Sequence, residues 1–238
     1  MAHSIAGAFK PKKSDELYTP KILVKPIWHH LDCWALEFCQ TYNRIPIVLC
    51  PFDTKDSEYV IELSNCSNWD IKYGHLITGE DFFTYDYGDW DICISNPPFS
   101  LKKKIYERLF QIGKPFALLG NMMQINYEEI GRLFSEHQIQ ILSFDRRVSF
   151  DGNPSSFMSG YFCYKFLSNN LIFEKLANNN AGKYHIPSQM YNGARWHNMN
   201  KVLHMMQQCP PNLAYTKPMM ILPKRNKNGI YNRKETTN

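Results

Sequence analysis

The residues best suited to chemistry are Asn96-Pro97-Pro98-Phe99, which directly follow a short apolar run at residues 91–95. Each proline fixes its own φ angle and lacks an N–H donor, so the pair holds the nearby backbone carbonyls rigid. The Asn96 side-chain oxygen and the Pro97 carbonyl are two acceptors suited to an amino group with two hydrogens. Phe99 adds a ring on which a planar group can stack. The segment predicts a receptor for the exocyclic amine of a flat, conjugated substrate.

The same residues could form a turn that only ends a strand, because Asn-Pro and Pro-Pro pairs commonly punctuate loops. Three neighbouring features favour the receptor. An apolar strand precedes the segment, an aromatic residue ends it, and a helix follows that begins with the basic residues Lys102, Lys103 and Lys104.

Strand-like and helical patterns alternate along the chain. Strands are predicted at residues 45–50, 71–76, 91–95, 115–119 and 139–144, and helices at 26–42, 57–65, 101–112 and 127–136, with Pro26 in a first turn. A last strand at 159–167 could lie antiparallel at a sheet edge. The alternation predicts an α/β fold with a doubly wound, mostly parallel sheet. In such sheets ligands bind outside the carboxyl ends of the strands, so we expect chemistry after Cys50, Leu76 and Ser95.

After residue 168 the sequence becomes Asn-rich and contains proline, so we expect a catalytic domain at 1–168 and a small irregular appendage at 169–238. The charge divides similarly. Residues 183–238 carry nine Lys/Arg and one acid, a balance of +8, whereas residues 1–182 carry 18 basic and 21 acidic residues, a balance of −3. This asymmetry fits a segment that contacts a polyanion and fits a solvated tail equally well.

Composition argues against several classes of protein. A chain of 238 residues with 44% hydrophobic and 14% aromatic residues has enough apolar sequence for an ordered core. There is no apolar run of about 18 residues and no secretory leader pattern, so we expect no membrane span. Seven scattered cysteines without a Cys-x-x-Cys pair predict reduced thiols in a cytoplasm. No metal site is expected, because the pair His29-His30 has no cysteine or carboxylate at ligand spacing.

Two segments carry a resemblance to a known family. Asn96-Pro97-Pro98-Phe99 matches the (Asp/Asn/Ser)-Pro-Pro-(Tyr/Phe/Trp) motif of amino-group methyltransferases that use S-adenosylmethionine. Residues 14–20, Ser-Asp-Glu-Leu-Tyr-Thr-Pro, resemble the N-terminal motif of phage and bacterial DNA adenine-N6 methyltransferases. The resemblance is colinear over residues 14–165. It implies a Rossmann-like methyltransferase fold, S-adenosylmethionine as cofactor, DNA as partner, and a bacterial or phage-infected host cell, in some relatives within restriction-modification systems.

The resemblance also implies roles for the matched residues. Asn96, Pro97, Pro98 and Phe99 would be catalytic, with Phe99 stacking on the flipped base. Cofactor-binding residues would lie in three segments: Tyr18, Thr19 and Pro20, then Pro51, Phe52 and Asp53, then Asp81 and Phe82. The cofactor loop departs from the family, because Cys50 stands where an acid is usual and no glycine follows. Asp53 or Asp56 is then the candidate partner of the cofactor's ammonium.

The basic residues predicted to contact nucleic acid are Lys102, Arg146, Arg147, Arg195, Lys224 and Arg225. For Arg146 and Arg147, pairing with nearby acids is the open alternative. Two other functions fit the same motif. One is methyl transfer to RNA adenine or to a protein glutamine, because both present an amine on a planar group. The other is a catalytically decayed nucleic-acid-binding module, which the missing glycines suggest.

Overall fold

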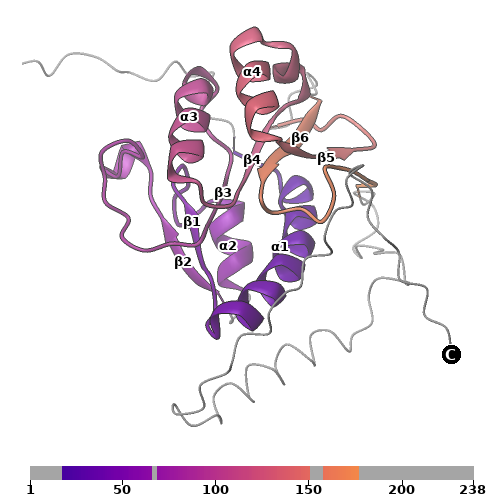
Figure 1. Ribbon diagram of the computed structural model, residues 1–238. Coiled ribbons are helices and arrows are strands. Elements are labelled where there is room, and N and C mark those ends of the chain that lie inside the picture. Colours follow the sequence, from indigo (N-terminus) through magenta and orange to yellow (C-terminus); the bar gives the residue numbers. More distant parts are fainter. Residues whose placement is uncertain (1–17, 66–68, 151–157, 177–238) are drawn as a thin grey trace, which may run out of the picture. The chain divides into compact units, whose positions relative to one another are not determined.

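Seven strands form one mixed sheet in the computed structural model, which describes residues 18–65, 69–150 and 158–176 (Figure 1). The strand order is β2-β1-β3-β4-β6-β5-β7. The strands are β1 (Ile47–Cys50), β2 (Asp70–Tyr73), β3 (Ile92–Ser95), β4 (Phe116–Asn121), β5 (Gln140–Phe144), β6 (Ser159–Tyr164) and β7 (Leu171–Glu174). Only β6 pairs antiparallel with its neighbours among these described strands. The predicted α/β fold with a mostly parallel sheet is confirmed.

Helices cover both faces of this sheet (Figure 1). α1 (Lys21–Tyr42) and α2 (Glu58–Ser64) share one buried cluster with Val48 and Cys50 of β1. α3 (Lys102–Ile112) and α4 (Glu128–His137) share the other, which takes Leu49 from the same strand. Alternate residues of β1 therefore face opposite layers, as the period of a strand requires. Short 3-10 turns follow β2, β3 and β4: η1 (Leu76–Thr78), η2 (Phe99–Leu101) and η3 (Met122–Asn126).

The first helix starts earlier than predicted. The pattern placed Pro26 in a first turn, but α1 begins at Lys21 and Pro26 lies inside it, so this prediction is wrong. Pro20 precedes the helix with φ of −64°, a value that proline fixes and that leads into a helix. The ring of Pro26 removes a single helical donor, the one that would have reached the carbonyl of Ile22. Thr19, just before this helix, is buried and forms a hydrogen bond with Tyr59 of α2.

Two strands near the end of the described chain differ from expectation. β6 is antiparallel as predicted, but it lies inside the sheet between β4 and β5 and not at an edge. Its residues from Ser159 to Cys163 are all buried, which is the pattern of a strand covered on both faces. β7 was not predicted, and it carries the sheet beyond residue 168 by pairing parallel with β5. The remainder of the predicted appendage, residues 177–238, lies outside the described residues.

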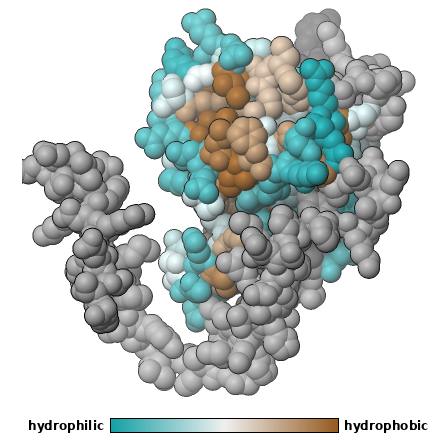
Figure 2. Space-filling view, turned by 90° about the vertical axis from the view of Figure 1, so that its right-hand side faces the viewer, coloured by the Kyte–Doolittle hydropathy of each residue, from teal (hydrophilic) through white to brown (hydrophobic). Residues whose placement is uncertain are grey.

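β7 is an edge strand of the described sheet, and its two sides differ. Ile172 packs against the α1 and α2 cluster, and the Glu174 carboxylate accepts a hydrogen bond from His30 Nε2 of α1 at 2.8 Å. Leu171 and Phe173 point to the other side and are exposed. Figure 2 shows hydrophobic surface, bordered by hydrophilic residues, on the side of the domain that carries β5 to β7.

The described residues hold no helix that is long and apolar enough to cross a bilayer. In the same residues, no group of three or more His, Cys, Asp or Glu side chains is placed to hold a metal ion.

Candidate active site

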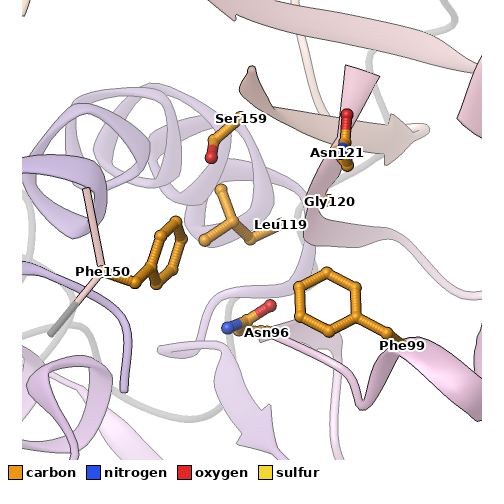
Figure 3. Close-up of a pocket in the computed structure, with 7 residues that line it drawn as sticks. All are labelled: Asn96, Phe99, Leu119, Gly120, Asn121, Phe150 and Ser159. Atoms are coloured by element: carbon orange, nitrogen blue, oxygen red, sulfur yellow. The ribbon is translucent and has the colours of Figure 1, made fainter. Parts of the chain in front are cut away.

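The predicted catalytic loop lies at the carboxyl end of β3, as expected for an open α/β sheet. Asn96 follows the strand directly, Pro97 is buried, and Pro98 leads into the η2 turn with φ of −58°. Asn96 and Phe99 line a small hollow with about 210 Å³ of empty space, part of it open solvent (Figure 3). The view shows the Asn96 amide between the rings of Phe99 and Phe150. An acceptor group and two aromatic rings thus share one site.

The other lining residues were not predicted from the sequence; they are Leu119, Gly120, Asn121, Phe150 and Ser159. Gly120 and Asn121 end β4, whose carboxyl end lies at the same sheet edge, so the strand-end rule could have found them. A Cβ on Gly120 would stand 2.5 Å from Gln124 Nε2, so a side chain there would displace Gln124. Ser159 is the first residue of β6. Because β6 runs antiparallel to β4, Ser159 pairs with Asn121 and lies at the carboxyl end of β4.

Asp53 joins the loop after β1 to the catalytic strand. Its buried carboxylate accepts a hydrogen bond from the hydroxyl of Ser95, the residue before Asn96. Its backbone N–H donates to the Gly74 carbonyl at 3.0 Å. Burial raises the pKa of Asp53 to about 7, although the Ser95 and Ser57 hydroxyls act to lower it. Near neutral pH this carboxyl is therefore divided between its protonated and ionised forms.

Cys50 cannot supply the negative charge that Asp53 can. Its thiol is buried, and burial raises its pKa well above the usual value. The thiol stays neutral at the position where the related family usually has an acid. Asp53 is consequently the acid of the 50–57 loop that reaches the buried end of the catalytic strand.

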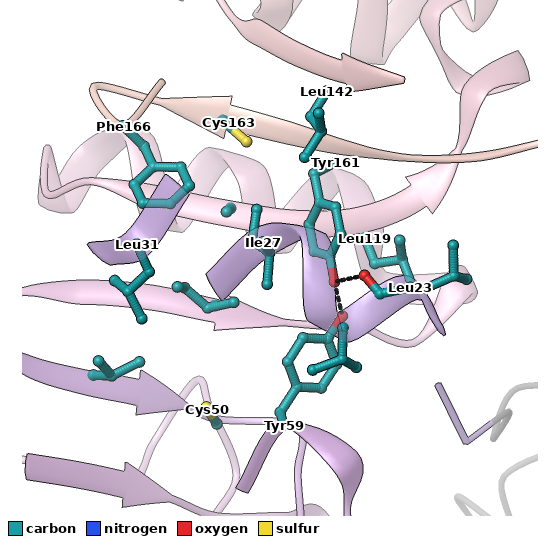
Figure 4. Packing of buried hydrophobic residues seen from close by; sticks show 14 of the residues in the cluster. Leu23, Ile27, Leu31, Cys50, Tyr59, Leu119, Leu142, Tyr161, Cys163 and Phe166 are labelled. Atoms are coloured by element: carbon teal, nitrogen blue, oxygen red, sulfur yellow. Dashed lines mark hydrogen bonds between the residues drawn. The ribbon is translucent and has the colours of Figure 1, made fainter. Parts of the chain in front are cut away.

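Tyr59 and Tyr161 form a relay of hydroxyl groups that ties α1 to α2 and β6 (Figure 4). The Tyr161 hydroxyl donates to the Leu23 carbonyl at 3.0 Å, so the 2.8 Å contact between Tyr59 and Tyr161 has Tyr59 as its donor. The Thr19 hydroxyl in turn donates a hydrogen bond to the Tyr59 hydroxyl. This bond acts to lower the pKa of Tyr59, but burial has the larger effect and raises it. The buried relay holds Thr19 against α2, whereas Tyr18 is 66% exposed.

The second and third predicted cofactor segments meet through their aromatic rings. The centroids of Phe52 and Phe82 lie 5.1 Å apart in an edge-to-face arrangement. The Arg108 guanidinium of α3 lies 5.3 Å from the Phe82 centroid. The Asp81 carboxylate accepts from the Phe83 N–H at 3.0 Å, which closes a local turn. Residues 51–53 and 81–82, distant in sequence, therefore form one wall.

The residues at this wall fit the polar groups of S-adenosylmethionine, which include hydroxyl and ammonium donors. One carboxylate oxygen of Glu80, Oε2, is buried and has no hydrogen-bond partner among the described residues. A buried acceptor without a donor is costly alone and is satisfied by a ligand donor. The Nδ1 atom of His75 accepts a hydrogen bond from the Ile77 N–H and so caps η1. Glu80 gave no sequence signal, because a turn brings it back to the end of β2.

The predicted nucleic-acid contacts divide into three groups. Lys102 is buried, with its ammonium 4.2 Å from the centroid of the Phe99 ring. Arg146 and Arg147 are exposed after β5, and Arg146 lies 3.8 Å from the Asp145 carboxylate and donates to the Leu176 carbonyl. The remaining three lie outside the described residues: Arg195, Lys224 and Arg225.

Three solved methyltransferases resemble this fold at low sequence identity. A protein described as a class I S-adenosylmethionine-dependent methyltransferase from Listeria monocytogenes is 8% identical, with a TM-score of 0.44 over 83% of this chain and 74% of that one. A protein described as an O-methyltransferase from Agrobacterium tumefaciens is 12% identical, with a TM-score of 0.32 over 66% and 77%. A protein-(glutamine-N5) methyltransferase from Alicyclobacillus acidocaldarius is 12% identical, with a TM-score of 0.27 over 61% and 97%.

Sequence comparison is more specific for the part of the chain around the catalytic loop. A stretch of 49 residues is 37% identical to the Type II methyltransferase M.EcoRI of Escherichia coli, and covers 21% of this chain. The match spans only 15% of that relative's length. Residues 84–149, which include Asn96 and Phe99, match the model of the family described as adenine-specific methyltransferase EcoRI. Over residues 84–149, the chain is therefore similar to the adenine-specific methyltransferase EcoRI family.

Proposed function

We propose that this chain transfers a methyl group from S-adenosylmethionine to the N6 amino group of adenine in DNA. The observation that carries the proposal is the hollow at the end of β3, where the Asn96 amide lies between the rings of Phe99 and Phe150. The family match over residues 84–149 includes this loop and supports adenine as the target base.

The chemistry requires an activated amine, because the lone pair of the adenine amino nitrogen is delocalised into the ring. The Asn96 side-chain oxygen and the Pro97 carbonyl accept hydrogen bonds from its two N–H groups and favour a pyramidal nitrogen with an available lone pair. S-adenosylmethionine, when bound, supplies the electrophilic methyl group. After transfer the nitrogen loses one proton to solvent, because neither acceptor is a base. Positioning and electrostatic complementarity lower the barrier without a strong base.

The target base must leave the duplex to reach this loop. Extrusion costs a few kcal/mol, which stacking on aromatic side chains partly offsets. Phe99 and Phe150 supply rings on either side of Asn96 in the hollow. Phe150 adds a second candidate contact with the base to the one predicted from the sequence.

The cofactor is assigned to the wall beside this hollow. Asp53 and Glu80 provide the hydrogen-bond acceptors, and Phe52 and Phe82 provide the aromatic rings. Thr19 and Pro20, at the start of α1, close the pocket. The remaining residues assigned to it are Tyr18, Pro51 and Asp81. Asp53 is the acid that the divergent loop offers to the ammonium group. Its hydrogen bond with Ser95 connects this wall to the catalytic loop.

Expression in a methylation-free bacterial host, followed by single-molecule sequencing, tests the proposal. We expect modified adenines in one sequence context with the wild-type chain and none with Asn96→Ala. Asn169→Ala, an exposed asparagine between β6 and β7, is the matched control and keeps the modification. Unmodified DNA, together with transfer of tritiated methyl groups to RNA or to a protein extract, would assign the activity to another amine. Absence of any transfer and of S-adenosylmethionine binding in calorimetry would favour a decayed nucleic-acid-binding module.

A further inference from the structure

Lys102 lies in surroundings that are unusual for a lysine. The residue is only 6% exposed, and it begins α3 directly after the η2 turn that contains Phe99. Its ammonium lies 4.2 Å from the centroid of the Phe99 ring, within the range of a cation–π interaction. Burial lowers the pKa of Lys102 to about 8, so the side chain remains mostly protonated at neutral pH.

This placement works against the stability of the fold. Transfer of an ammonium from water into the protein is unfavourable. A positive charge in the first turn of a helix also opposes the helix dipole, which favours negative charge there. An uncharged side chain of similar length would avoid both effects. Lys103, the next residue, shows the ordinary alternative, because it reaches solvent and pairs with Glu129 at 2.7 Å.

The position of Phe99 indicates what the buried cation does. Phe99 lines the hollow with Asn96, whereas Lys102 is not among the described residues that line it. We propose that Lys102 is a positioning residue, whose ammonium holds the Phe99 ring in the orientation that presents it to the extruded base. The inference rests on the proposed function of the hollow. It deepens that function by assigning to Lys102 an effect on how well the extruded base binds.

The physical basis is preorganisation. A cation–π contact is stronger when the cation is desolvated, as it is for a nearly buried lysine. A ring already held in one orientation loses less conformational freedom when a base stacks on it. α3 places a second cation near an aromatic ring six residues later. The Arg108 guanidinium lies 5.3 Å from the Phe82 centroid at the predicted cofactor wall. The helix therefore supplies a cation to an aromatic ring at each of the two proposed binding sites.

Kinetics of three variants test this role. Lys102→Met removes the charge and keeps the length, Lys102→Arg keeps the charge, and Lys103→Met is the control for loss of a neighbouring cation. We expect Lys102→Met to raise the KM for DNA about tenfold with a smaller effect on kcat, and to weaken the 2-aminopurine fluorescence signal of the extruded base. Lys102→Arg should restore most of the loss, and Lys103→Met should match the wild type. An unchanged KM for Lys102→Met would overturn the inference and leave the proposed function intact.

A thermodynamic cycle tests the contact without any substrate. Lys102→Met and Phe99→Leu are made singly and together, and urea unfolding is measured for all four proteins. We expect coupling of about threefold or more in the unfolding equilibrium constant, with Lys102→Met alone folded and no less stable than the wild type. Additive effects would contradict the inference whatever the substrate. A wild-type chain that never methylates DNA would instead refute the proposed function, while the cycle still reports on the contact.

Discussion

At the scale of single residues, the two loop residues that line the hollow could be predicted and most of their surroundings could not. Asn96 and Phe99 were predicted because their chemistry is local, set by two prolines and an aromatic residue in sequence. Glu80 and Phe150 reach the site through turns that no periodic pattern describes. Lys102 shows the converse: its charge indicated contact with phosphate, but the η2 turn directs its ammonium to Phe99.

Asp53 should make stability depend on pH. Its pKa is about 7 in the folded chain and ordinary in the unfolded one, so the folded state binds more protons between about pH 4 and 7. The free energy of unfolding should therefore fall as pH rises through this window, by up to about 1.4 kcal/mol per pH unit for one such carboxyl. Asp53→Asn should reduce the slope, as measured by urea unfolding at several pH values.

Two companion variants make this measurement specific. Burial also raises the pKa of Asp32 in α1 to about 7, so Asp53→Asn should leave a residual slope that Asp32→Asn removes. Asp56→Asn, at an exposed acid in the same loop, should leave the wild-type slope unchanged. Equal slopes for the wild type and Asp53→Asn would show that Asp53 is ionised across this range.

At the scale of elements, local sequence signals predicted where most helices and strands lie in the sequence. They did not predict which strands lie next to each other in the sheet. Gly113 ends α3 with φ of 72°, and Ser57 caps α2 by accepting from Val60 N–H, as their residue types indicate. The interior position of β6 depends on pairing with β4 and β5, which no local pattern encodes. β7 was missed because its four residues alternate between exposed and half-buried and follow an Asn-rich turn.

The hydroxyl relay between α1, α2 and β6 should contribute measurably to stability. Tyr161→Phe removes the acceptor of the Tyr59 hydroxyl and the side-chain donor to the Leu23 carbonyl. We expect a loss of about 1–3 kcal/mol in the free energy of unfolding. Because the relay also fixes Thr19, the affinity for S-adenosylmethionine in calorimetry should fall as well.

Tyr164→Phe is the control, because Tyr164 lies on the same strand, is only half-buried and takes no part in the relay. It should change the free energy of unfolding by less than about 0.5 kcal/mol. A Tyr161→Phe variant as stable as this control would exclude an energetic role for the relay.

At the scale of the whole molecule, charge is separated along the chain: the balance is −3 over residues 1–182 and +8 over residues 183–238. The proposed function assigns phosphate contacts to the basic end. If Lys224 and Arg225 each neutralise one phosphate, the double variant with Lys224→Gln and Arg225→Gln should reduce the slope of log affinity against log salt by nearly 2. Fluorescence anisotropy of a labelled duplex at several salt concentrations measures this slope.

Replacement of Lys103 and Lys104 by glutamine removes the same charge from the start of α3 and should leave the salt slope as it is. An equal reduction in both double variants would mean that net charge, and not contact by the C-terminal residues, controls binding.

The direction of β7 has a consequence for how DNA would be held. Since β7 runs parallel to β5, and β5 runs in the same direction as β1 and β3, the chain passes Glu174 at the edge where Asn96 lies. The carboxyl ends of β7, β5 and β3 therefore lie along the same edge of the sheet. If Arg146 or Arg147, which follow β5 at this edge, binds a phosphate, the effective concentration of duplex along the edge that carries Asn96 rises. Weak, sequence-independent contacts at this edge would then favour productive encounters, because a duplex held there searches only the space close to it.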